Sequence, residues 1–316
     1  MRLDWALTAY TTSWNVYRST VAGQLGELLP DGEFIKVNTY TDNTVTGGLT
    51  YFYTVRSKNA DNGGYTFSDQ IQAFPYSIQV YENKTADFEG QTAWSLYDEA
   101  RVTADFGNVA SWQGGDRIKY DTTGRVRFYL PAGMLGSANT GGVIKAKIAG
   151  KDEYTMEYEI RFDAGFPWSK GGKIPGLSGG KGYTGGEGDL ARTLGDGFSV
   201  RMMWREDGRI IPYVYHAGMA EGELYGDTFG ATVGYFTNTQ AHVVKYYVKL
   251  NTGSNFDGIL RIYLDGVQAY ENTKICYRRD QSQIDTCHIA IFAGGSTADW
   301  NMTADGYIRL SYISWT

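Results

Sequence analysis

Residues 197–216 read GFSVRMMWREDGRIIPYVYH, with a strand-like run on either side of Glu206-Asp207-Gly208. A three-residue hairpin loop that places glycine in the left-handed position is a common β connection. With this loop Arg201 lies opposite Tyr213, and directly opposed residues share one face of a sheet. A two-residue loop would shift the register by one and mix polar and apolar side chains on both faces. The stretch therefore predicts a β-hairpin with one polar and one apolar face.

The two faces of this hairpin predict different tasks. The apolar face carries Val200, Met202, Trp204, Ile210, Pro212 and Val214. The polar face carries Ser199, Arg201, Tyr213 and Tyr215, with Met203 and Ile211 as its one apolar pair. Arginine binds carboxylates in a bidentate manner, and a phenol near cations can transfer protons. The polar face suits a sugar that bears a carboxylate, and the alternative is a solvated face with ordinary Tyr–Arg stacking.

Strand-like runs continue outward from the hairpin through residues 76–316. Residues 154–162 alternate apolar and polar side chains, which is typical of a strand with one buried face. The further expected strands are 125–129, 142–148, 198–205, 210–216, 242–250, 258–265, 286–293 and 306–315. The chain is rich in Gly (41) and Tyr (25), and no long stretch has a helical period. These features predict an all-β chain whose larger part is one β-sandwich or jelly roll.

Residues 1–75 hold a second set of short strands with turns between them. This segment resembles a fibronectin type III domain, a small immunoglobulin-like β-sandwich. Trp5 matches the buried tryptophan of that fold, Tyr17 lies in its "NVYR" strand, and Tyr51 matches its tyrosine corner. Nothing before Trp5 supplies the first strand, so either the domain is incomplete or the chain is a piece of a longer protein. The resemblance implies a spacer or scaffold.

Charge and hydropathy limit the partners. The formal net charge is −6, which gives no indication of nucleic-acid binding, although a local cationic cleft can attract an anion against the global sign. No apolar run approaches the roughly 18 residues of a membrane span. Met1-Arg2-Leu3-Asp4-Trp5 contains no signal-peptide core. We expect no membrane partner.

The cysteine and histidine content predicts no metal site. The chain has 2 Cys and 3 His, and the histidines are scattered. Cys276 and Cys287 lie in two strand-like runs separated by a polar turn. They form either a disulfide, in an oxidising compartment, or two buried small residues, and the sequence leaves both open.

A glycine-rich stretch follows the strand that ends at Phe162. It reads FPWSKGGKIPGLSGG over residues 166–180, and we interpret it as a loop. It lacks the order of a phosphate-binding loop. Together, "YEIRFDAGFPWSKGGKIPGLSGG", "GFSVRMMWREDGRIIPYVYH", "GILRIYLDG" and "AIFAGG" resemble the alginate and glucuronan lyases of polysaccharide lyase family 14 and its relative, family 20. The similarity covers most of residues 150–316.

The resemblance implies a β-jelly roll, a concanavalin-like sandwich, with an active site on one concave sheet. Its implied catalytic residues are Lys173, Ser199, Arg201, Tyr213 and Tyr215. We expect Trp168, Lys170, Glu157 and Arg161 to contact substrate. Some relatives place a glutamine just after the equivalent of Gly141-Gly142, where this chain has Val143 and Ile144.

The implied reaction is β-elimination on a polyuronate, with alginate first and glucuronan next. Arg201 and Lys173 would neutralise the carboxylate, and the tyrosines or Lys173 would move protons. This chemistry needs no cofactor, and we expect a secreted monomer that acts on an acidic polysaccharide. Three alternatives stay open. One is a glycoside hydrolase that uses Glu157 and Glu159 as its carboxylate pair. The others are a non-catalytic carbohydrate-binding module and a structural adhesion fragment.

Overall fold

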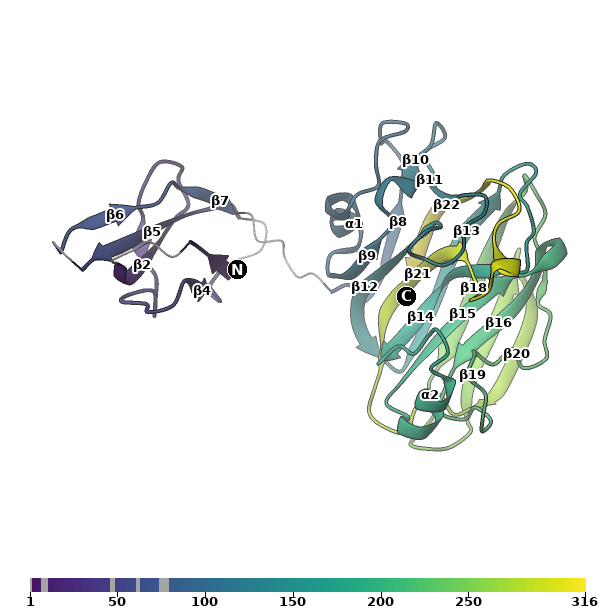
Figure 1. Ribbon diagram of the computed structural model, residues 1–316. Coiled ribbons are helices and arrows are strands. Elements are labelled where there is room, and N and C mark those ends of the chain that lie inside the picture. Colours follow the sequence, from purple (N-terminus) through teal and green to yellow (C-terminus); the bar gives the residue numbers. More distant parts are fainter. Residues whose placement is uncertain (1, 7–10, 46–48, 61–62, 74–79) are drawn as a thin grey trace. The chain divides into compact units, whose positions relative to one another are not determined.

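The protein forms two compact units, Met1–Gln79 and Val80–Thr316. The computed structural model describes all residues except 1, 7–10, 46–48, 61–62 and 74–79 (Figure 1). The expected boundary after residue 75 lies outside the described residues.

The first unit is built from short antiparallel strands. One pair joins β1 (Arg2–Asp4) to β4 (Thr39–Thr41). The other sheet has the order β3-β2-β5-β6, with β7 also on β5; its strands are β2 (Thr11–Ser19), β3 (Glu27–Leu28), β5 (Tyr51–Asn59), β6 (Tyr65–Phe67) and β7 (Ile71–Ala73). Trp5 is half-buried and packs against the core of this unit, as expected, and its ring lies 6.0 Å from that of the buried Trp14.

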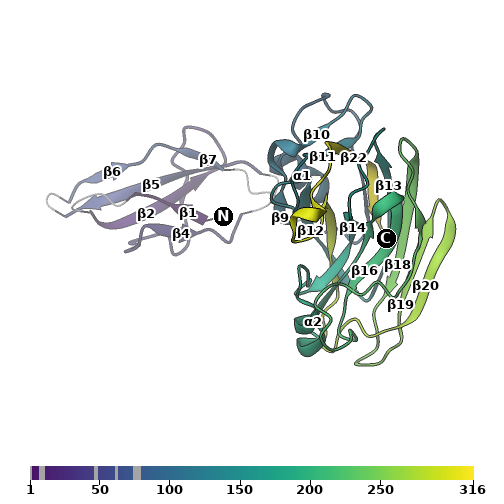
Figure 2. The same cartoon turned by 45° about the vertical axis from the view of Figure 1, so that its right-hand side comes forward.

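The second unit is an all-β sandwich of two antiparallel sheets, as expected for a jelly roll. The seven-stranded sheet has, in spatial order, β17 (Gly234–Tyr235), β16 (Arg209–Tyr215), β15 (Gly197–Trp204), β14 (Gly172–Gly180), β21 (Ile284–Ala293), β12 (Gly142–Lys151) and β9 (Val109–Gln113). The eight-stranded sheet has β10 (Ile118–Tyr120), β11 (Val126–Leu130), β22 (Gly306–Trp315), β13 (Glu153–Phe162), β18 (Ala241–Lys249), β19 (Gly258–Leu264) and β20 (Val267–Ile275), with β8 (Lys84–Asp87) also on β22. Figure 2 shows β14 and β16 in one layer and β18 and β19 in the other.

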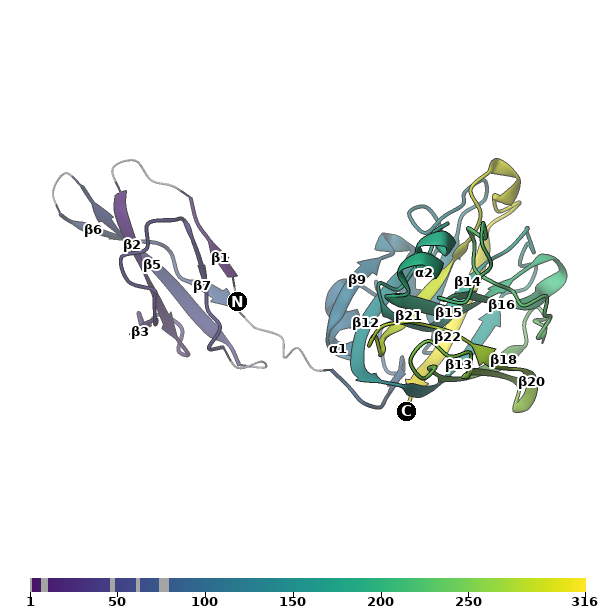
Figure 3. The ribbon, with the colours of Figure 1, turned by 90° about the horizontal axis from the view of Figure 1, so that it is seen from below.

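Helices are short in the described residues. They are α1 (Glu99–Phe106) and α2 (Gly188–Leu194), with single 3₁₀ turns η1 (Gly115–Arg117), η2 (Glu206–Gly208) and η3 (Ala298–Trp300). Asp98 caps α1 by accepting a hydrogen bond from the Arg101 amide. In Figure 3, α2 lies against β14 and β15 on the side away from β22 and β13. We call this side of the seven-stranded sheet the cleft face.

The core lies between the two sheets. Along β13, Tyr154, Met156, Tyr158 and Ile160 are buried in it, whereas the residues between them are half-exposed. This is the alternation that the sequence predicts. β14 and β15 differ, because nearly every residue in both is buried. Loops and α2 lie over their cleft face. A site on this face is therefore shielded from water.

The structure answers two questions that the sequence raises, one about the glycine-rich stretch and one about the two cysteines. The glycine-rich stretch expected as a loop forms β14 from Gly172 onward, because its small residues fit between two neighbouring strands. A Cβ on Gly176 or Gly179 would lie within about 2 Å of the Val200 or Gln283 carbonyl oxygen. Cys276 and Cys287 are both buried and free, which favours the second of the two open alternatives.

Candidate active site

The register of the β15–β16 hairpin agrees with the prediction. Ser199 pairs with Tyr215, Arg201 with Tyr213, and Met203 with Ile211. The alternate residues of β15, Val200, Met202 and Trp204, are fully buried in the core between the sheets. Period-two alternation therefore sends the polar residues of both strands to the cleft face.

The turn between these strands contains two left-handed residues, whereas the sequence predicts one. Both Asp207 (φ 58°) and Gly208 (φ 76°) are left-handed. A Cβ on Gly208 would lie 2.2 Å from the Phe236 carbonyl oxygen, so only glycine fits there. The Arg205 amide donates to the Arg209 carbonyl across the loop and holds the predicted register.

A bulge in β14 sets the position of Lys173. The pairing of β14 shifts register against both neighbouring strands between Lys173 and Leu177. The Pro175 carbonyl points into the core, where it accepts hydrogen bonds from the hydroxyls of Tyr246 (2.7 Å) and Tyr158 (3.3 Å). Gly176 leaves room for Arg201, whose Cγ would lie 3.0 Å from a Cβ at that position.

Lys173 and Arg201 are two buried basic side chains next to Tyr213. Their exposed fractions are 8% and 2%. The Lys173 Nζ lies 2.8 Å from the Met203 sulfur and 3.3 Å from the centroid of the Tyr213 ring. The Arg201 Nε and Nη2 atoms have no hydrogen-bond partner within the described parts of the chain. Buried cations without partners are costly, so an anionic ligand would be strongly favoured here.

Burial and mutual repulsion shift the protonation of this group. Burial, with the charges of Arg201 and Arg205, holds the pKa of Lys173 well below its usual range. Burial also lowers the pKa of Arg201 and raises the pKa of Tyr213. The lowered pKa favours the neutral amine of Lys173 and the raised pKa favours the protonated phenol of Tyr213, so the two side chains suit the opposite tasks of proton acceptor and proton donor.

A cavity of about 730 Å³ opens above these residues. Its lining includes Ser111, Gln113, Lys145, Lys173, Thr184, Arg201, Met203, Arg205, Tyr213, Tyr225, His288, Phe292 and Trp300. The lining residues come from six adjacent strands, β16 to β9, from the turn η3 and from loops that hold Thr184, Arg205 and Tyr225. They include four Lys or Arg residues and, within the described chain, no Asp or Glu. In a chain of net charge −6, this cavity is a local concentration of positive charge.

Most of the lining residues were not predicted from the sequence, and three of them bear chemistry. His288 is 2% exposed and its Nδ1 has no partner among the residues that the structure covers. Lys145 pairs with His288 between β12 and β21. Gln113 on β9 pairs with Val143, so an amide does reach the position next to Gly142, but from a neighbouring strand. Alternation along β12 and β21 could have placed Lys145 and His288 on one face, but their pairing is nonlocal.

Two predicted residues share the face but do not line the cavity. The Ser199 hydroxyl donates to the Tyr183 carbonyl at 2.6 Å. The Tyr215 hydroxyl accepts from the Gly186 amide at 3.1 Å, and its ring meets that of Tyr213 edge to face at 5.7 Å. Both side chains are fully buried, and Tyr215 packs with Ala191 of α2. They position the 183–186 segment and the Tyr213 ring.

The structure does not bring the four expected contact residues into the cavity. Trp168 packs on the core, with its ring 4.7 Å from that of Phe162. Lys170 forms an exposed ion pair with Asp299, next to the lining residue Trp300. Glu157 and Arg161 lie on β13, on the outer face of the other sheet, because their neighbours along the strand fill the core.

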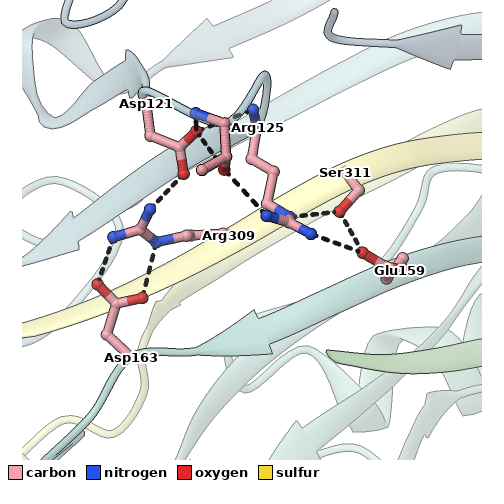
Figure 4. A network of polar contacts seen from close by, with 7 residues as sticks. Asp121, Arg125, Glu159, Asp163, Arg309 and Ser311 are labelled. Carbon is pink, nitrogen blue, oxygen red and sulfur yellow. Dashed lines mark hydrogen bonds and ion pairs between the residues drawn. The ribbon is translucent and has the colours of Figure 1, made fainter. Parts of the chain in front are cut away.

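Carboxylates on that outer face are already paired. Glu157 accepts from Lys245 (2.8 Å) and Tyr312 (2.9 Å), and its pKa is lowered. Figure 4 shows Glu159 held by Arg125 and Ser311, beside Arg309, which bridges Asp121 and Asp163. A glycosidase pair of Glu157 and Glu159 therefore has no support, because both lie away from the cavity and both are engaged.

No helix in the described ranges is long and apolar enough to cross a membrane. Within the same ranges, no group of three or more His, Cys, Asp or Glu residues is arranged to hold a metal ion.

Comparison with known proteins agrees with this geometry. The family model "Polysaccharide lyase 14" matches residues 132–312. A mutant of the alginate lyase Aly36B, solved in complex with alginate tetrasaccharide, is 28% identical; the match covers 75% of this chain and 97% of that one, with a TM-score of 0.67. The PL-14 alginate lyase from Aplysia kurodai shares the fold at 21% identity and a TM-score of 0.61, over 74% of this chain and 98% of that one.

A further match concerns a much longer protein. An amylopullulanase from Thermoanaerobacter thermohydrosulfuricus is 37% identical over 73 residues, which is 23% of this chain but only 5% of that protein. The lyase family model, by contrast, spans more than half of the chain and includes every strand of the hairpin and the β14 segment. The chain belongs to the polysaccharide lyase 14 family.

Proposed function

We propose that this protein cleaves a polyuronate, alginate first and glucuronan next, by β-elimination. The observation that carries the proposal is the buried, unpartnered Arg201 guanidinium in a cavity lined by four basic residues and no described acid. A carboxylate would supply the missing partner in the bidentate geometry that guanidinium favours. A neutral sugar would leave the Arg201 guanidinium unpaired, which is unfavourable in a buried site.

The chemical task of the site is to stabilise negative charge. The C5 proton of a uronate is weakly acidic because the adjacent carboxylate is negative. Arg201, fixed by the hairpin and by Gly176, would neutralise that carboxylate and the enolate-like transition state. The electron pair left by the C5 proton forms the C4–C5 double bond, the C4–O4 bond breaks, and O4 takes a proton.

The protonation states favour one division of roles. Lys173, whose pKa is lowered, gives up its proton more readily than an ordinary lysine and in its neutral form can accept the C5 proton. Tyr213, whose pKa is raised, stays protonated and can donate to O4. Ser199 and Tyr215 act by positioning, since their hydroxyls are engaged with Tyr183 and Gly186.

The choice of alginate rests on the Aly36B complex, because that relative holds an alginate tetrasaccharide. The test is to incubate the chelator-treated protein with alginate and with glucuronan and to follow ultraviolet absorbance from the new double bond. We expect an increase with at least one polymer. A folded protein that acts on neither would overturn the proposal.

We further propose that the first unit is a fibronectin type III-like spacer. Its five-stranded sheet, its separate strand pair and a core of Val16, Leu29, Tyr51 and Tyr53 support this. We also propose that the protein is a monomer that acts outside the cell, where a polysaccharide substrate is met.

A further inference from the structure

The cavity extends well beyond the reactive cluster. On the cleft face, one transverse row runs from Arg201 on β15 past Gly176 on β14 to His288 on β21 and Lys145 on β12. Ser111 on β9 ends the row beside Lys145. Three strand spacings separate the backbones at Arg201 and Lys145, about 14 Å at about 4.8 Å per spacing. Their charged ends lie closer, since the charge of Arg201 acts on Lys145.

Lys145 is an unpaired cation at the far end of this row. It is half-buried, it lines the cavity, and no ion-pair partner for it occurs among the described residues. Burial and the charge of Arg201 lower its pKa, and Glu187 is the one nearby acid that opposes this. The Glu187 carboxylate is engaged by the Thr184 amide at 2.8 Å. Lys145 therefore has no acid in ion-pair contact among the described residues, although the charge of Glu187 acts on it from nearby.

His288 lies between the two cations and is also without a full set of partners. Its side chain is buried, its Nδ1 is unpartnered in the described structure, and it lines the same cavity. Burial, with the charges of Arg201 and Lys145, holds its pKa well below the usual range. A neutral imidazole can donate one hydrogen bond to a ligand oxygen without adding charge.

Lys147 shows that this arrangement is not a general property of the strand. It lies two residues along β12 from Lys145, so both side chains share one face. The Lys147 Nζ is bound by Asp285 at 3.0 Å and by Thr286 at 3.1 Å. The same residue type is thus neutralised outside the cavity and open inside it.

We propose that Lys145, with His288 and Ser111, forms a second carboxylate-binding subsite, which holds another uronate of the same polymer than the one at Arg201. This inference rests on the proposed function and deepens it. The polymer runs across the strands of the seven-stranded sheet, and its carboxylates meet cations at both ends of the row. The enzyme therefore recognises a stretch of charged polymer rather than a single uronate.

The subsite predicts a dependence on chain length that is specific to Lys145. We expect Lys145→Gln to raise KM about 10-fold for the polymer and for long oligouronates, which is one charge-assisted hydrogen bond converted to affinity. The shortest oligomer that is cleaved should not reach the subsite, so its KM should stay unchanged. The kcat should change little for any length, because the bond is cleaved elsewhere.

The experiment compares wild type, Lys145→Gln, Lys145→Arg and the matched control Lys147→Gln over a series of alginate oligomers. Lys145→Arg keeps the charge and should restore KM, and Lys147→Gln should behave as wild type. The subsite is refuted if Lys145→Gln leaves KM unchanged at every length. It is also refuted if kcat falls equally for short and long substrates, since that would indicate a role in the reaction itself.

A binding measurement separates this inference from the proposed function. If wild type cleaves no polyuronate, the proposed function fails. Calorimetric binding of an alginate hexamer to wild type and to Lys145→Gln then still tests the subsite. Weaker binding in Lys145→Gln alone would keep the subsite, and equal binding in both, or none in either, would refute it.

Discussion

Arg309 and Arg201 differ in whether acidic side chains pair with their guanidinium groups. Arg309 on β22 donates to both oxygens of Asp163 at 2.7 Å and also pairs with the buried Asp121 (Figure 4). Its pKa is raised by these carboxylates. Arg201 has the same charge and deeper burial, but its Nε and Nη2 have no partner in the described residues. The first arginine stabilises a sheet, and the second is available for an anion.

The phenol of Tyr213 is the group whose removal should affect rate most cleanly. Tyr213→Phe keeps the ring that Lys173 contacts and removes only the hydroxyl. We expect kcat to fall by about 10²-fold or more, the usual loss for a general acid, with unfolding almost unchanged. Tyr235→Phe, on the neighbouring strand β17 and outside the cavity, is the control and should keep full activity. Near-normal activity of Tyr213→Phe would remove Tyr213 from the mechanism.

The buried Lys173 should make stability depend on pH in a defined window. Its folded pKa is lowered, so between that value and the unfolded value of about 10.4 the unfolded state binds more protons. The free energy of unfolding should therefore rise with pH in this window, by about 1.4 kcal/mol for each unit of lowering. Below the lowered pKa both states carry the proton, and the penalty for burying the charge is constant.

Lys173→Met removes this contribution and should be inactive but more stable at pH 7. Denaturant unfolding of both proteins at pH 7 and pH 9.5 is the measurement. Lys145 titrates in the same window, so the difference between the two proteins is the quantity to compare. A stability difference that is the same at both pH values would contradict the lowered pKa.

Among the strands, β14 shapes the candidate site through its bulge. It directs the Pro175 carbonyl into the core and leaves Gly176 under Arg201. Tyr246→Phe would remove the shorter of the two hydrogen bonds to that carbonyl. We expect a loss of about 1–2 kcal/mol in stability, because the oxygen is buried, and a lower activity through displacement of Lys173.

The neighbouring residue offers a matched control for this change. Tyr247 lies next to Tyr246 on β18 but faces outward, and its hydroxyl donates to the exposed Glu153 at 3.0 Å. Tyr247→Phe should change stability by no more than about 0.5 kcal/mol and leave activity intact. Equal effects of the two substitutions would mean that the bulge does not depend on the buried hydrogen bond.

Local signals predict the hairpin well and the rest of the cleft poorly. The Glu206–Gly208 turn and period two give the register of β15 and β16 without knowledge of any other strand. The sequence predicts a loop where β14 forms, because proline and glycine are poor strand formers. They fit here because the neighbouring strands approach β14 too closely for larger side chains. The sequence does not predict that Lys145 and His288 lie together, because β12 and β21 are far apart in sequence and pair only in the folded sheet.

At the scale of the whole molecule, the described elements that line the cavity all belong to Val80–Thr316. A shortened chain that begins at Val80 should therefore fold and cleave short oligouronates with unchanged kcat/KM. Circular dichroism checks the fold, and the ultraviolet assay checks activity. If the shortened chain folds but is inactive, residues before Val80 contribute to the site.

We predict that the protein breaks a uronate linkage by elimination and not by hydrolysis. The most direct measurement follows ultraviolet absorbance and new reducing ends together during digestion of alginate by the wild-type protein. Elimination produces one double bond for each broken linkage, so we predict equal numbers of the two throughout the reaction. Reducing ends that accumulate without absorbance would contradict the account.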